Sequence, residues 1–65
     1  MISEIDIWHA AALMMKRYGD KAPIESGKRG DELANAGDDG GTAIWRRIEV
    51  AVENLASTTS AGPVH

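Results

Sequence analysis

Apolar residues recur at helical spacing in three segments of this chain, and the segments are separated at Gly19 and Gly37. Residues three and four positions apart lie on one face of an α-helix, so each segment predicts a helix with one apolar face. The 65-residue chain contains no cysteine, so disulfides and thiolate metal sites cannot add to its core. The sequence therefore predicts one all-α domain, which is a small three-helix bundle or a helical hairpin plus one helix.

The first helix is predicted over residues 3–18. Ser3 is a suitable N-cap with Asp6 at the reciprocal position, and Gly19 is a suitable stop. Apolar side chains cover about half of the circumference of this helix. The members of this apolar arc that we expect in the core are Ile5, Trp8, Ala12 and Met15.

The second helix is predicted over residues 23–36, and its interior contains two glycines. Gly27 and Gly30 each weaken a helix by about 0.5 to 1 kcal/mol relative to alanine, so this helix depends on packing. Both lie on the apolar stripe, where they would admit a bulky neighbour, and Trp8 and Trp45 are the candidates. The other predicted core residues of this helix are Leu33 and Ala34.

The third helix is predicted over residues 39–56. Asp38, Asp39 and Thr42 are each able to cap its start, and the sequence does not decide between them. Val50 is an apolar exception on its otherwise polar side. The predicted core residues of this helix are Ile44, Ile48, Val52 and Leu55, with Trp45 beside them.

Residues 57–65 show no helical periodicity and include a glycine and a proline. Such a segment buries too little apolar surface to offset the entropy of ordering it. We therefore expect a helical domain over residues 1–56 and a disordered tail over residues 57–65.

The charge pattern argues against a nucleic-acid surface. The formal net charge is -3, whereas affinity for phosphate comes from clustered Lys and Arg. Arg46 and Arg47 follow a tight turn, as in a recognition helix, but Glu49 and Glu53 offset their charge. Nucleic acid is thus an unfavoured partner, and a small DNA-associated regulator with a helix-turn-helix-like third helix is the alternative prediction.

Two further features bear on location. No apolar run reaches the roughly 20 residues that a membrane span requires. The N-terminal residues also lack the basic region of a signal peptide. We therefore expect a cytoplasmic protein that does not interact with membranes.

No group of residues suits a metal, a cofactor or a catalytic centre. His9 has only Asp6 at a spacing that suits joint ligation, and metal sites usually need three or four ligands. Asp38 and Asp39 precede a glycine pair, but the alternating oxygen ligands of a calcium loop are missing. The carboxylates of the helices fall on faces where we expect no pocket. We therefore expect no metal, no cofactor, no small-molecule substrate and no enzymatic activity.

Several short motifs suggest a family. They are Ile7-Trp8, Ala11-Ala12, Lys16-Arg17-Tyr18-Gly19-Asp20, Arg29-Gly30-Asp31-Glu32-Leu33, Gly37-Asp38 and Trp45-Arg46-Arg47-Ile48. Together they resemble a family of short bacterial proteins of unknown function, and the resemblance extends up to Leu55. It implies a single helical domain of bacterial origin and no catalytic residue. Gly27 and Gly30 depart from the family pattern, in which this segment is usually rich in alanine.

The function predicted from these features is a non-catalytic helical protein-interaction or structural module. The apolar arc of the first helix is wider than two short partner helices can cover, so part of it should stay exposed. Ile7, Met14 and Tyr18 lie on the side of the arc furthest from Ile5, and we expect them to form an interaction surface. A symmetric homodimer would cover this surface, and a different protein is the other candidate partner.

Overall fold

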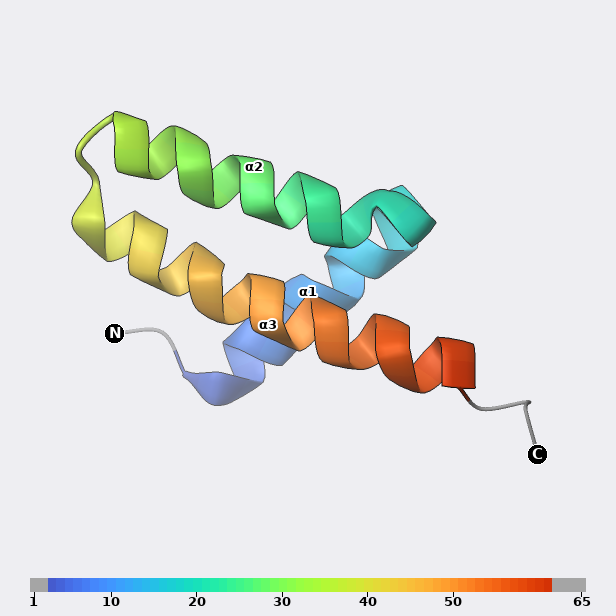
Figure 1. The fold of residues 1–65 in the computed structure, drawn as a ribbon. Helices are drawn as coiled ribbons and strands as arrows, with labels where there is room; N and C mark the ends of the chain where they lie inside the picture. The colour runs from blue at the N-terminus through green and yellow to red at the C-terminus, as the bar shows by residue number, and fades with distance from the viewer. Residues whose placement is uncertain (1–2, 62–65) are drawn as a thin grey trace.

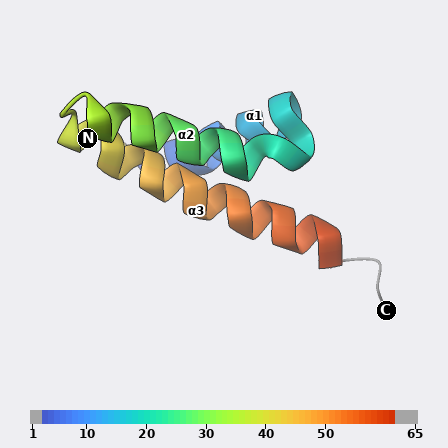
Figure 2. The ribbon, with the colours of Figure 1, turned by 45° about the horizontal axis from the view of Figure 1, so that its top comes forward.

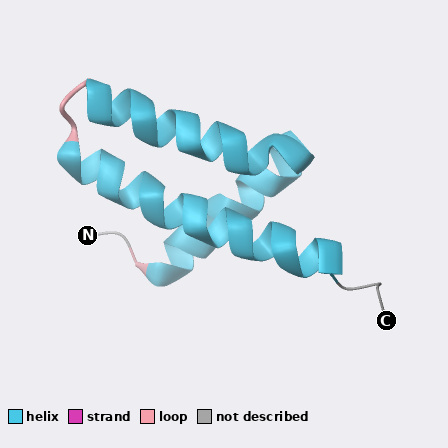
Figure 3. Ribbon diagram, in the orientation of Figure 1, coloured by secondary structure: helices cyan, strands magenta, loops and turns pink. Residues whose placement is uncertain are grey.

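The computed structural model describes residues 3–61, with the side chains of residues 3–57. The elements are α1 (Glu4–Tyr18), a 3-10 turn η1 (Gly19–Lys21), α2 (Ala22–Asn35) and α3 (Asp39–Ala61). Figure 3 shows that the described part of the chain contains helices and loops and no strand. Helices α2 and α3 form an antiparallel hairpin, and α1 crosses α3 (Figure 1). The predicted fold class, an all-α small three-helix bundle or helical hairpin plus one helix, is confirmed.

Both ends of α1 follow the predicted signals. The Ser3 hydroxyl oxygen accepts a hydrogen bond from the Asp6 backbone N–H at 3.2 Å, which confirms the N-cap. At the other end Gly19 has a φ of +56°, and its N–H donates to the Met15 carbonyl. A positive φ strains any residue with a Cβ, so this position favours glycine.

The turn between α2 and α3 combines a glycine stop with an aspartate cap. Gly37 has a φ of +80°, and the following Asp38 N–H donates to the Leu33 carbonyl at 2.9 Å. The Asp38 carboxylate then accepts from the Gly41 N–H at 2.9 Å. Of the three candidates for the cap of α3, the structure therefore selects Asp38. Thr42 instead donates its hydroxyl to the Asp38 carbonyl at 2.7 Å.

Helix α3 extends to Ala61, beyond the predicted end at residue 56. Residues 57–61, which were predicted to begin a disordered tail, therefore continue the helix. The rest of the predicted tail, residues 62–65, lies outside the described residues. Figure 2 shows the C-terminal part of α3 extending past the ends of α1 and α2.

The core lies where α3 meets the other two helices. Its buried apolar residues are Ile7, Ala11, Met14, Ala22, Ile48, Ala51 and Val52. The prediction for α3 is confirmed at Ile48 and Val52, and the remaining stripe residues Ile44, Trp45 and Leu55 are partly buried against the core. In α2, Leu33 is half-buried and Ala34 is exposed, so the prediction for Ala34 is wrong.

The predicted orientation of α1 is wrong. Ile5 is 79% exposed and Trp8 is 41% exposed, whereas Ile7 is only 3% exposed and Met14 is buried. Ala12 is exposed as well. The helix thus directs the opposite side of its apolar arc toward α3.

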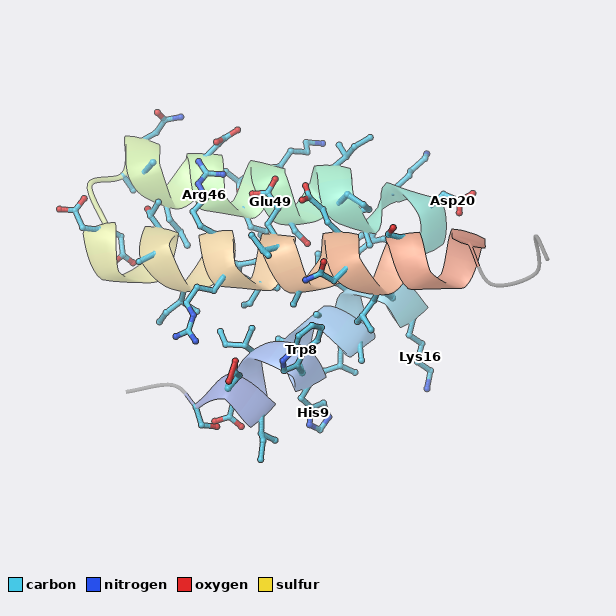
Figure 4. All side chains as sticks on the ribbon, turned by 60° about the horizontal axis from the view of Figure 1, so that its bottom comes forward. Trp8, His9, Lys16, Asp20, Arg46 and Glu49 are labelled. Atoms are coloured by element: carbon cyan, nitrogen blue, oxygen red, sulfur yellow. The ribbon has the colours of Figure 1, made fainter. Side chains whose placement is uncertain are left out.

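The residues that border each side of the arc explain this choice. If the side of α1 that carries Ile5 faced α3, His9 and Lys16 would lie at the edge of the contact between the two helices, because they are next to that side on α1. The Ile7 side is bordered instead by Ala10 and Met15, and both are partly buried against the core. Figure 4 shows His9 and Lys16 pointing away from α3. Turning the Ile7 side inward therefore keeps the charged and polar groups in water.

The two glycines of α2 face α3, but their neighbours are polar. A Cβ at Gly27 would lie 3.1 Å from the Glu49 Oε2, and a Cβ at Gly30 would lie 3.0 Å from the Arg46 Nη1. The close approach is therefore real, whereas the prediction of a tryptophan as the bulky neighbour is wrong. The glycines make room for an ion pair on α3.

No helix within the described residues is long and apolar enough to cross a membrane.

Candidate functional site

A groove with a volume of about 460 Å³ lies between α1 and α3. Its lining residues are Glu4, Ile7 and Trp8 from α1 and Arg46, Arg47, Val50, Ala51 and Asn54 from α3. We call it the Trp8 groove after its aromatic lining residue, which Figure 4 labels on α1. Ile7 and Ala51 belong to the core and form an apolar floor. Trp8 and Val50 line the groove while staying 41% and 58% exposed.

Helical spacing explains why these side chains surround a hollow. Trp8 follows the buried Ile7 by one residue, about 100° around the helix, so it stands at the flank of the α1 contact. Val50 is two residues from the buried Ile48 and therefore points away from the core. Between the two helices Ala51 contributes only a methyl group, which leaves the space unfilled.

The two arginines of the groove differ in their partners. Arg46 turns toward α2 (Figure 4), and its guanidinium donates to the Asp31 carboxylate of α2 at 2.7 Å and to the Glu49 carboxylate of α3 at 3.3 Å. These hydrogen bonds, with Asp31 the stronger, raise the pKa of Arg46 above its ordinary value. Arg47 and Glu4, by contrast, form no ion pair among the side chains of residues 3–57.

Small residues form the opposite seam, between α2 and α3. Ala22, Ser26 and Gly30 recur every fourth residue and are all buried. This spacing lets two helices approach closely. The Ser26 hydroxyl is fully buried and has no hydrogen-bond partner among the residues that the structure describes. Beside the seam, the Arg29 guanidinium lies 5.9 Å from the Trp45 ring centroid.

The structure gives a mixed result for the residues predicted to form an interaction surface. Met14 is buried and Ile7 forms the groove floor, so neither is exposed as predicted. Tyr18 is partly buried against the core. Sequence reasoning missed the combination of Trp8 with Val50 and Arg47. The available signal was Val50, the apolar exception on the polar side of α3.

His9, which was considered as a metal ligand, is exposed. Within the described residues, no three His, Asp or Glu side chains come together in a way that could hold a metal ion.

Comparison with known proteins finds no relative. No family model matches the chain, and neither a curated protein nor a solved structure matches it.

Proposed function

We propose that the protein is a non-catalytic helical interaction module that binds an amphipathic helix in the Trp8 groove. The observation that carries the proposal is the joint exposure of Trp8 and Val50 on the walls of a hollow with an apolar floor. Exposed apolar side chains that lie together mark binding surfaces, and tryptophan is a frequent energetic anchor of such surfaces. A groove between two helices suits a third helix that inserts its apolar face.

The charges beside the groove define the chemistry of the partner. Arg47 would pair with an acidic side chain, and Glu4 would pair with a basic one. A fitting helix therefore has a small apolar face with one acidic and one basic residue beside it. Charges at the edge of an interface mainly set orientation and association rate, so the apolar contact supplies most of the affinity.

The alternative of a DNA-associated regulator receives no support from the arrangement of α3. Arg46 is occupied by Asp31 and Glu49, so its charge is compensated within the chain. The other arginine of α3, Arg47, lines the groove together with Glu4, so a phosphate bound there would meet a carboxylate. Bacterial origin and a cytoplasmic location stay predictions from the sequence.

Site-specific photo-crosslinking in the native cells tests the proposal. A photoreactive residue replaces Val50, and a second variant carries it at Leu13, which is 57% exposed but does not line the groove. We expect a protein adduct from position 50 that is absent from position 13, with a helical segment identified at the crosslink by mass spectrometry. Adding Trp8→Ala should reduce the adduct. No adduct at position 50, or equal adducts from both positions, would refute the proposal.

A further inference from the structure

We infer that the helix bound in the Trp8 groove belongs to a second copy of this chain, an inference that rests on the proposed function. On the walls of the groove, the acid Glu4 of α1 and the base Arg47 of α3 form no ion pair with another side chain of residues 3–57. In a two-fold symmetric dimer every contact occurs twice, with the roles of the copies exchanged. If α1 of one copy docks against α3 of the other, both Glu4–Arg47 pairs form and neither charge is left without a partner.

The spacing along the helices allows the charged and apolar contacts to form together. Trp8 lies one turn after Glu4 on α1, and Val50 lies one turn after Arg47 on α3. Residues three or four positions apart on a helix are about 5 to 6 Å apart at their Cβ atoms. If α1 of one copy runs parallel to α3 of the other, placing Glu4 against Arg47 also brings Trp8 to Val50 of the partner. Both exposed apolar side chains of the groove are covered by this one arrangement.

The neighbouring charges do not compete with this pairing. Arg46 already holds Asp31 and Glu49 on the α2 side of α3. Asp6, the other acid in the first turn of α1, does not line the groove. A foreign helix would need an acid and a base placed to match Arg47 and Glu4, whereas a second copy supplies both by symmetry.

Charge reversal tests the inference by sedimentation equilibrium. We expect wild type to dimerise, and Glu4→Arg and Arg47→Glu each to raise the dimer dissociation constant by roughly tenfold or more, because like charges then face each other twice. An equimolar mixture of the two variants should dimerise again, since one copy then carries two bases and the other two acids. The double variant Glu4→Arg/Arg47→Glu should also recover. Recovery in the mixture cannot arise from contacts within one chain.

Asp6→Arg is the matched control, because it reverses a first-turn acid outside the groove and should dimerise like wild type. Circular dichroism melts verify that each variant is folded. A strictly monomeric wild type at high micromolar concentration, or a mixture of the two reversed variants that stays monomeric, overturns the inference. If position 50 still crosslinks to a different protein, only the identity of the partner is refuted. If it crosslinks to nothing, the proposed function fails as well.

Discussion

The close approach of Arg46 to Gly30 decides whether the substitution Gly30→Ala stabilises or destabilises the folded state. Gly30 is buried in α2, and a Cβ there would lie 3.0 Å from Nη1 and 3.2 Å from Cζ of Arg46. The guanidinium would have to shift by a few tenths of an ångström to admit it. Arg46 can do so because its side chain is 45% exposed, but the shift disturbs the 2.7 Å contact with Asp31.

The two opposing contributions are similar in size. Replacing glycine by alanine inside a helix stabilises the folded state by about 0.5 to 1 kcal/mol. An exposed ion pair such as that of Arg46 with Asp31 contributes a similarly small amount, and the shift of Arg46 would forfeit part of it. We therefore expect Gly30→Ala to be nearly neutral in the wild-type background. In an Arg46→Ala background, Gly30→Ala should stabilise the folded state by the whole gain from replacing glycine with alanine in a helix, about 0.5 to 1 kcal/mol.

Thermal melts of the four proteins in this double-mutant cycle provide the assay. For so small a domain, 1 kcal/mol shifts the Tm by about 4 to 8 °C, so the gain without Arg46 corresponds to about 2 to 8 °C. All melts use one low protein concentration, because self-association would raise the Tm. If Gly30→Ala lowers the Tm equally in both backgrounds, Arg46 is not the group that limits the space at Gly30.

Three further predictions concern the core, the buried hydroxyl of α2 and the N-cap of α3. Ile48→Ala should destabilise by about 2 to 5 kcal/mol in chemical denaturation because Ile48 is buried, whereas Ile24→Ala, at an exposed position, should stay within about 0.5 kcal/mol of wild type. Ser26→Ala should stabilise the folded state by about 0.5 to 2 kcal/mol, since it removes a buried hydroxyl that has no partner within the described part of the chain. A lower denaturation midpoint for this variant would show that the hydroxyl is hydrogen-bonded in solution. Asp38→Ala should lower the Tm through loss of about 0.5 to 2 kcal/mol of capping energy, and Asp38→Asn should keep most of it; equal losses would contradict the cap.

The helix boundaries followed from local chemistry and were largely predictable. Ser3 caps α1, and Gly19 and Gly37 occupy the positive-φ positions that end α1 and α2. These signals act within a single turn, so the sequence contains all the information that they need. The end of α3 was not predictable in this way, because residues 57–61 carry no stop signal and little helical periodicity, yet they continue the helix.

The environment of the glycines required knowledge of packing between helices. Their position on the stripe of α2 correctly predicted that they face a neighbour. Which residues of α3 face them depends on the rotation and register of the hairpin, and these place Arg46 and Glu49 there. Neither quantity is encoded in the spacing of apolar residues within one helix.

The rotation of α1 shows why the candidate site could not be derived from its apolar arc alone. The stripe of Ile5, Trp8, Ala12 and Met15 and the stripe of Ile7, Ala11, Met14 and Tyr18 both have helical spacing. The premise that α3 and α2 leave part of the arc uncovered agrees with the structure, since Ile5 and Trp8 stay exposed. What decides between the stripes is the polarity of their borders, where His9 and Lys16 favour water and Ala10 and Met15 accept burial. The buried side of a wide apolar arc on a small helical protein is therefore better predicted from the residues at the borders of the arc than from those at its centre. The side left in water, which here includes Trp8, is where a binding surface should be sought.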